Sequence, residues 1–229
     1  MDRLARHTAL RCSLPRSGDA LEAGTLYLAP PDRHLLVKKG RVLVIKGPRA
    51  NHYRPAVDVL FRSAAVAFGP AVVGVVLTGM LHDGTAGLEF IKRCGGVAVV
   101  QAPQEAEYPS MPETALRNVT IDYVAALPAM GELLGCLSAG SVPANPAAIS
   151  EDLVHEASIA ERVVGTADEA NQLGHLVPLT CPDCGGNLWE VTHGKVLRYR
   201  CHTGHAFTGD ELLNNTQHTW KKHCGWPCA

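Results

Sequence analysis

The sequence has no excess of charge, no long hydrophobic run and no internal repeat. Its 21 basic and 22 acidic residues give a net charge of −1, so charge gives no indication of binding to nucleic acid or to an anionic membrane surface. No apolar segment follows Met1 or approaches the length of a membrane span. We therefore expect neither a secretory leader nor insertion into a membrane.

The eight cysteines do not have the spacing of a disulfide framework. Three of them gather in one pattern near the C-terminal end. The other five are scattered along the chain, at Cys12, Cys94, Cys136, Cys224 and Cys228. We expect a cytoplasmic protein whose thiols are reduced.

The gathered cysteines predict a zinc site. Cys181 and Cys184 are separated by two residues, and Cys201 follows seventeen residues after Cys184. His205 is the preferred fourth ligand, because four residues let the turn bring its ring back to the metal; the adjacent His202 is the second choice. Four protein ligands close a tetrahedral site, so we expect a structural zinc ion. The alternative is a β-hairpin with free thiols.

Alternating patterns between residues 25 and 138 predict an α/β fold. A doubly wound, mostly parallel sheet is expected, because apolar runs of strand length alternate with helical patterns. Residues 35–37 and 41–45 flank Lys-Lys-Gly and predict a β-hairpin. The remaining strands are expected at 25–29, 72–77, 97–100 and 123–125, and the helices at 55–68, at 85–93 and from 110 onward.

Composition divides the chain into four parts. We expect the α/β domain over 1–138, a linker with a candidate helix over 139–172, the zinc module over 173–210, and an irregular tail over 211–229. A module of this size has little core and should fold only with its metal. The tail contains Cys224 and Cys228 beside His218 and His223, which suits a second metal site, although a shifted reading frame explains the tail more simply.

Asp83 stands where a buried strand is followed by a helix, in Leu-Thr-Gly-Met-Leu-His-Asp-Gly at 77–84. Ligands bind at the carboxyl ends of strands in open α/β sheets. Asp83 there suits the orientation of a catalytic histidine. It equally suits the cap of the helix that begins at Gly84. Spacing alone favours the cap, because caps are common, and the two roles can coexist.

Four ordered motifs resemble the catalytic domain of the chemotaxis protein-glutamate methylesterases, the CheB family. The resemblance covers about residues 20–138. The motifs are Tyr-Leu-Ala-Pro-Pro-Asp-Arg-His at 27–34, Asn-His-Tyr-Arg-Pro-Ala-Val-Asp-Val-Leu-Phe-Arg-Ser at 51–63, Leu-Thr-Gly-Met-Leu-His-Asp-Gly-Thr-Ala-Gly-Leu at 77–88 and Ser-Met-Pro-Glu-Thr-Ala-Leu at 110–116. The zinc module is similar to an appendage of family members that lack a receiver domain.

The resemblance implies hydrolysis of glutamate methyl esters on chemoreceptors by a Ser-His-Asp mechanism. Serine attacks the ester carbonyl, histidine takes the serine proton, and backbone N–H groups hold the oxyanion. Carried over by motif, Asp83 is the aspartate and Met80 supplies a main-chain N–H to the oxyanion hole. Arg54, Pro55 and Asp58 belong to a family motif near the cleft, with no chemical step assigned to them.

The family's serine and histidine motifs are not found here. The serine lies in a Gly-x-Ser-x-Gly-Gly turn after the first strand, and the histidine lies in a Gln-His-x-Pro-like segment after the second. Residues 1–19 contain neither pattern, so we expect the nucleophile, the base and two central strands to be absent. Three functional interpretations follow: an esterase homologue, a non-catalytic remnant or zinc-dependent binding module, or half of a split esterase completed by an upstream chain.

Other serines and histidines are not expected to replace the triad residues. Ser63 lies in a predicted helix interior, and Ser110 is predicted to cap a helix. His34 and His52 are predicted on surface loops, and His82 should point away from its neighbour Asp83. A triad requires geometry as well as the right residue types.

Overall fold

The computed structural model describes residues 2–142, 148–159, 161 and 166–213. Its central sheet has three parallel strands in the order β5 (Val73–Val76), β6 (Val97–Gln101) and β7 (Tyr123–Ala125). Valine-rich strands suit a sheet that is covered by helices. This arrangement confirms the predicted α/β class with a parallel sheet. The alternative second metal site of the tail lies outside the described residues.

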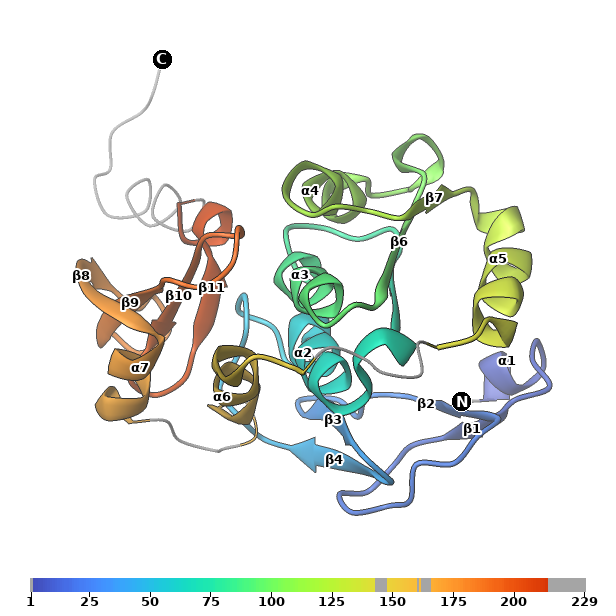
Figure 1. Ribbon diagram of the computed structural model, residues 1–229, viewed down its shortest axis with the longest axis horizontal. Helices are drawn as coiled ribbons and strands as arrows, with labels where there is room; N and C mark the ends of the chain where they lie inside the picture. Colours follow the sequence, from blue (N-terminus) through green and yellow to red (C-terminus); the bar gives the residue numbers. More distant parts are fainter. Residues whose placement is uncertain (1, 143–147, 160, 162–165, 214–229) are drawn as a thin grey trace.

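Helices cover the sheet. Figure 1 shows α2 (Val57–Phe68), α3 (Thr85–Arg93) and α4 (Ser110–Asn118) together on one side of the sheet, and α5 (Leu127–Ala139) on the other. Short 3₁₀ helices lie at Gly69–Ala71 and Pro103–Glu105. The core between the sheet and helices α2, α3 and α4 is apolar and includes Val76, Leu88, Phe90, Ile91, Ala98, Val100 and Ala115.

Gly87 lets α2 and α3 approach each other closely. A Cβ atom at this position would lie 2.5 Å from Cβ of Phe61 and 3.1 Å from Cα of Asp58. Only glycine fits such a contact without a shift of one helix. The close crossing brings the first turn of α2 next to the start of α3, where Asp83 lies.

The N-terminal strands lie outside the central sheet. After α1 (Asp2–Ala5), β1 (Arg11–Ser13) pairs in parallel with β2 (Thr25–Tyr27) in a separate two-stranded sheet. The predicted hairpin is confirmed as β3 (His34–Lys38) and β4 (Arg41–Ile45), with Gly40 at a φ of 79° in its turn. Glycine tolerates this left-handed conformation without steric cost.

The C-terminal part forms a separate antiparallel sheet. Its four strands are β8 (Gly174–Thr180), β9 (Asn187–Val191), β10 (Arg198–Cys201) and β11 (Ala206–Thr208), in the order β11-β10-β9-β8. Two helices precede it, α6 (Glu151–Ile159) and α7 (Ala167–Leu173). A capping box between Thr166 and Glu169 begins α7. We call α7 and the four strands together the C-terminal module.

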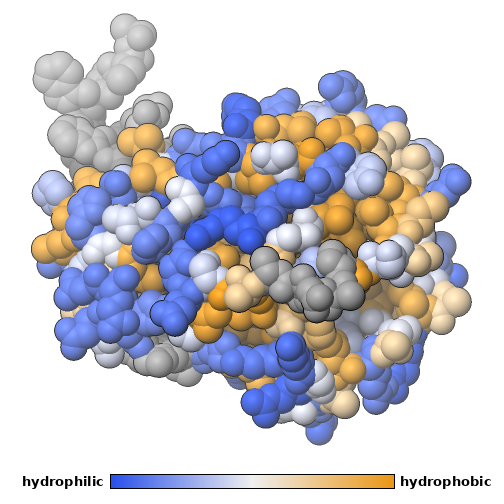
Figure 2. Space-filling view, in the orientation of Figure 1, coloured by the Kyte–Doolittle hydropathy of each residue, from blue (hydrophilic) through white to orange (hydrophobic). Residues whose placement is uncertain are grey.

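Buried charges join the C-terminal module to the α/β domain. Glu156 of α6 accepts two hydrogen bonds from Arg198 of β10, at 2.8 and 2.9 Å, and lies 3.9 Å from Arg62 of α2. Glu89 of α3 accepts hydrogen bonds from the main-chain N–H groups of Lys195 and Val196. In Figure 2, hydrophilic surface separates the module from a more apolar surface over the α4 and α5 side.

The described helices are all too short or too polar to cross a lipid bilayer. The longest of them, α5, has 13 residues, whereas a spanning helix needs about 20 predominantly apolar residues.

Candidate active-site turn and metal centre

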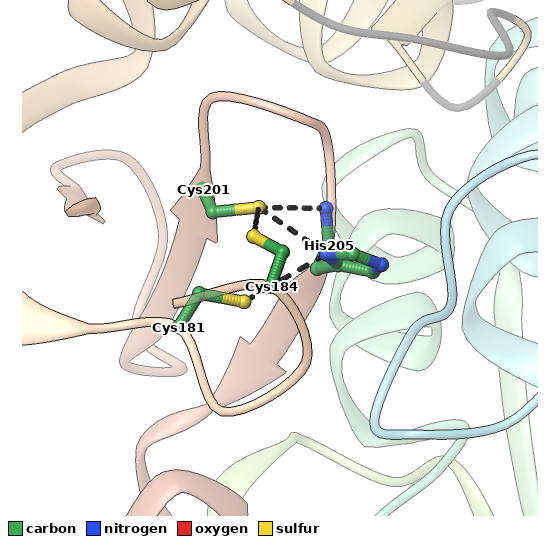
Figure 3. Close-up of side chains that lie close together, drawn as sticks. All are labelled: Cys181, Cys184, Cys201 and His205. Atoms are coloured by element: carbon green, nitrogen blue, oxygen red, sulfur yellow. Dashed lines mark hydrogen bonds between the residues drawn. The ribbon is translucent and has the colours of Figure 1, made fainter. Parts of the chain in front are cut away.

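The four predicted metal ligands meet between two loops of the C-terminal module. Cys181 and Cys184 lie in the turn between β8 and β9, which is closed by a hydrogen bond from the Cys181 N–H to the Gly186 carbonyl at 2.7 Å. Cys201 ends β10 and His205 precedes β11, and the Cys201 N–H donates to the His205 carbonyl at 3.0 Å. Figure 3 shows the three sulfurs and the imidazole converging on one point.

The spacing of the ligand atoms suits a tetrahedral metal ion. The Sγ atoms of Cys184 and Cys201 are 3.7 Å apart, and Nδ1 of His205 lies 3.4 Å from Sγ of Cys201 and 3.7 Å from Sγ of Cys181. All four ligand atoms lie within 4.8 Å of one another. Zinc–sulfur bonds of about 2.3 Å and zinc–nitrogen bonds of about 2.1 Å require ligand separations of roughly 3.5–3.8 Å. The residues therefore fit a metal ion.

Electrostatics in this cluster favour a thiolate. Hydrogen bonding with Cys181, and then with His205 and Thr203, lowers the pKa of Cys201 to about 2. The hydrogen bond with Cys201 raises the pKa of His205 to about 9. Hydrogen bonding with Cys201, followed by burial, raises the pKa of the Cys181 thiol. Cysteine binds metals as the thiolate, so metal binding would replace these protons.

Asp83 is buried at the N-terminus of α2. Its Oδ2 accepts a hydrogen bond from the Val57 N–H at 2.7 Å, and its Oδ1 accepts from the Asp58 and Gly84 N–H groups, each at 3.1 Å. The predicted capping role is therefore partly wrong. Asp83 caps α2, whereas α3 has Gly84 at its N-cap and no side-chain capping bond. The crossing of α2 and α3 decides which helix end meets the carboxylate.

The Asp83 carboxyl titrates near neutral pH. Burial, followed by repulsion from Asp58, raises its pKa to about 7, although the N–H groups of Val57 and Asp58 act in the opposite direction. A carboxyl group with such a pKa, at the end of a buried strand, is typical of functional sites.

The turn that carries Met80 is anchored on both sides. The Gly79 N–H donates to the Tyr108 carbonyl at 2.9 Å, and the Leu81 N–H donates to Oγ of Ser110 at 3.0 Å. Met80 itself is 62% exposed. Met80 therefore belongs to a turn that hydrogen bonds hold on both sides, and a fixed backbone is what an oxyanion donor requires. The oxyanion role of Met80 stays a prediction.

Two of the serine and histidine predictions are wrong. Ser110 does not cap α4, whose N-cap is Pro109. Its hydroxyl donates to the Gly79 carbonyl at 3.1 Å and so fixes the Met80 turn. His34 is 1% exposed rather than on the surface, and its Nδ1 accepts from the Ala56 N–H at 3.3 Å. Ser63 bonds backbone as predicted, by donating to the Leu60 carbonyl at 2.8 Å.

The family motif at 51–63 supports the start of α2. Arg54 donates to Oδ1 of Asp32 at 2.9 and 2.6 Å and to the Gly47 carbonyl at 2.7 Å. Asp58 is fully buried and accepts from the Gly87 N–H at 2.7 Å. Sequence reasoning did not single out Asn51, which contacts both Asp58 and β11. No local pattern marks a residue whose partners are so distant in the sequence.

The structure combines an α/β domain, which holds a buried carboxyl group after strand β5, with a module whose Cys/His cluster could hold a metal ion. The model of the CheB methylesterase family matches residues 1–134. The chain belongs to the CheB methylesterase family.

Known relatives agree with this family. A putative protein-glutamate methylesterase/protein-glutamine glutaminase of Leptospira interrogans is 41% identical over 116 residues, which is 50% of this chain and 60% of the relative. A protein-glutamate methylesterase/protein-glutamine glutaminase of Koribacter versatilis is 39% identical over 142 residues, 60% of this chain and 39% of the relative. This chain thus spans three fifths or less of these two relatives.

A solved structure shares the fold. The crystal structure of the Thermotoga maritima CheB methylesterase catalytic domain matches with a TM-score of 0.53 and 29% sequence identity. The match covers 58% of this chain and 72% of that domain. The matched share is therefore about the size of the α/β domain.

Proposed function

We propose that this chain carries the aspartate portion of a protein-glutamate methylesterase site. The observation that supports it most strongly is the buried carboxylate of Asp83, held by three N–H groups at the carboxyl end of β5, in a chain of the CheB family. We propose that the serine and the histidine come from outside this sequence, on a longer form of the protein or on a separate chain.

In the completed site, Asp83 orients the histidine and stabilises its imidazolium. The serine oxygen attacks the glutamate ester carbonyl and gives its proton to the histidine. The Met80 N–H stabilises the oxyanion, and the imidazolium then gives its proton to the departing methoxide, which leaves as methanol. Water hydrolyses the acyl-enzyme in the same manner. Because the names of the relatives include glutaminase, we propose that glutamine amides are also hydrolysed, with release of ammonia.

We propose that the Cys181, Cys184, Cys201 and His205 cluster holds zinc. Three sulfurs and one imidazole form a soft donor set that suits this ion, and four protein ligands leave no position for a substrate. The ion is therefore structural and stabilises the zinc module. We place this zinc module at 173–210, after the α/β domain at 1–138 and the linker at 139–172. The tail at 211–229 completes this proposed division.

We propose that methylated chemoreceptors are the partners and that the protein works in the cytoplasm. The described cysteines are all free thiols, which suits a reducing compartment. We propose no nucleic-acid partner, because the charge is balanced, and no membrane insertion, because none of the described helices is long and apolar enough to cross a bilayer.

Methanol release from a methylated receptor tests the proposal. The chain is measured alone and together with a serine- and histidine-bearing segment of a CheB relative. We expect release only from the mixture, and a loss in kcat of about 10⁴-fold with Asp83→Asn, because the histidine tautomer is no longer fixed. Asp168→Asn, an exposed position on α7, is the matched control and should leave the rate unchanged.

Release of methanol by the chain alone would contradict the assignment of the serine and the histidine to another segment. Equal rates for the mixtures with and without Asp83→Asn would contradict the role of Asp83. A mixture that binds receptor without releasing methanol would favour the binding-module interpretation instead.

A further inference from the structure

The loop between β4 and α2 lies against the metal-binding loops. The Asn51 N–H donates to the carbonyl of Ala206 at 2.8 Å, and the Ala206 N–H donates to the Arg49 carbonyl at 3.3 Å. Ala206 directly follows the proposed ligand His205. Main-chain bonds in both directions therefore join this loop to the residue next to the metal site.

The Asn51 side chain connects the C-terminal module to α2. Its Oδ1 accepts from the Thr208 N–H at 3.0 Å, and its Nδ2 donates to Oδ2 of Asp58 at 3.0 Å. Asn51 is 2% exposed. A buried amide whose two ends bond different parts of a protein fixes their relative position, since an unsatisfied buried polar group is costly.

The backbone of this loop depends on these contacts. Asn51 and His52 have φ angles of 48° and 67°. Two consecutive residues other than glycine in the left-handed region are unfavourable, and such conformations persist where the surroundings hold them. The strand that follows the metal ligand supplies part of that hold.

Asp58 continues the connection to Asp83. Asp58 accepts from Asn51 through its side chain and donates its own N–H to Oδ1 of Asp83. The contacts thus run from the residue after His205, through Asn51 and Asp58, to the predicted catalytic carboxylate.

The turn between β8 and β9, which carries Cys181 and Cys184, also contacts the loop between β4 and α2. Asp183 lies between Cys181 and Cys184, and its Oδ1 accepts from Nδ1 of His52 at 2.8 Å. The His52 ring also lies 5.0 Å from the ring of Phe207 in β11. Both halves of the metal site therefore hold the loop, and a metal ion that orders them orders the loop as well.

We propose that Asn51 is a positioning residue that couples metal occupancy of the C-terminal module to the placement of Asp83. With metal bound, β11 holds Asn51, and Asn51 holds Asp58 in the position where its N–H donates to Oδ1 of Asp83. Without metal, this support is lost and the first turn of α2 opens more often. The inference rests on the proposed metal site and extends its role from folding of the module to the esterase site.

Hydrogen exchange at the Val57 and Asp58 amides, the two α2 donors to Asp83, tests this inference. The full chain is compared with one equivalent of Zn²⁺ and after chelation. The test variant is Asn51→Gly, which removes both side-chain bonds and tolerates the positive φ. Asn118→Gly is the matched control, because Asn118 is exposed and bonds only within α4. Exchange at Val99 and Val100 in the buried strand β6 reports whether the core stays folded.

We expect chelation to speed exchange at both amides by about tenfold or more in the unmodified chain, as loss of supporting hydrogen bonds implies. Asn51→Gly should still bind one zinc ion, exchange fast with zinc present and change less than about twofold on chelation. Asn118→Gly should behave as the unmodified chain.

Equal exchange with and without zinc in the unmodified chain overturns the coupling, and this comparison decides the matter even if Asn51→Gly fails to fold. Retained protection in zinc-loaded Asn51→Gly overturns the role of Asn51. If the unmodified chain binds no zinc at all, the metal assignment fails together with the inference, whereas stoichiometric zinc without a change in exchange contradicts the coupling alone.

Discussion

Asp83 shows how one side chain can combine a structural and a chemical role. Its carboxylate caps α2, and burial together with Asp58 raises its pKa to about 7. The sequence identified the residue through its position after a buried strand and through the family motif. The helix that it caps could not be predicted, because that depends on the packing of α2 against α3.

The raised pKa makes the stability contribution of Asp83 dependent on pH. The carboxyl titrates near pH 7 in the folded chain and at about 3.9 when unfolded. The protonated form therefore favours folding, and its contribution is full below about pH 4 and is lost as the pH rises through about 7. The unmodified chain loses this contribution between pH 5 and pH 8, whereas an asparagine at position 83 cannot ionise. The unfolding free energy of Asp83→Asn minus that of the unmodified chain should therefore increase by at least about 1.4 kcal/mol from pH 5 to pH 8.

Urea unfolding at the two pH values measures this difference. Asp168→Asn on the exposed side of α7 should show no such gain. Unfolding free energies of the unmodified chain and of Asp83→Asn that change in parallel with pH would contradict the raised pKa.

At the scale of elements, the valine-rich strands and amphipathic helices of the central sheet were predictable from their periodicity. Strand β1 and helix α5 were missed. Three residues, Arg11–Ser13, are too few to show a pattern. In α5, Gly131, Gly135 and Pro128 interrupt an otherwise apolar segment, so its composition resembles a loop. The pairing of β2 with β1 is a tertiary contact that no local pattern encodes.

Helix packing offers a direct test at Gly87. A methyl group there would press into Phe61 and Asp58, so Gly87→Ala should lower the unfolding free energy by about 1–3 kcal/mol. The matched control is Gly135→Ala in α5, where nothing lies within 4 Å. It should raise the unfolding free energy by about 0.5–1 kcal/mol, as alanine does within helices.

Thermal or urea unfolding of the two variants measures both effects. A Gly87→Ala variant as stable as the unmodified chain would show that α2 and α3 can separate without cost.

At the scale of the whole molecule, the α/β domain and the C-terminal module are joined by a buried cluster of charges around Glu156. Arg62, Arg198 and Arg200 are each 3% exposed, and all three approach Glu156. Burial, followed by repulsion from Arg62, lowers the pKa of Arg200 to about 10. Burial alone would raise the pKa of Glu156, but attraction to Arg198, Arg62 and Arg200 outweighs burial and lowers this pKa.

Neutralising Glu156 should therefore destabilise the protein strongly. Glu156→Gln keeps the shape of the side chain and leaves three buried guanidinium groups with less compensating charge, so a loss of about 3–5 kcal/mol in unfolding free energy is expected. The exposed Glu151→Gln in the same helix should cost under about 1 kcal/mol.

Chemical denaturation at pH 7 compares these two variants with the unmodified chain. Similar losses for both would mean that the buried cluster contributes no more than an exposed charge.

Strand β5 is an edge strand of the central sheet, and β6 is its one neighbour among the described strands. Its other side presents main-chain N–H and carbonyl groups that can accept one more strand. A strand added there in the same direction as β5 would end beside the turn at 77–84. Residues that followed that strand would then face Asp83, so extension of the sheet by a single strand is a geometric route by which the serine and the histidine of the proposed site would reach this carboxyl group.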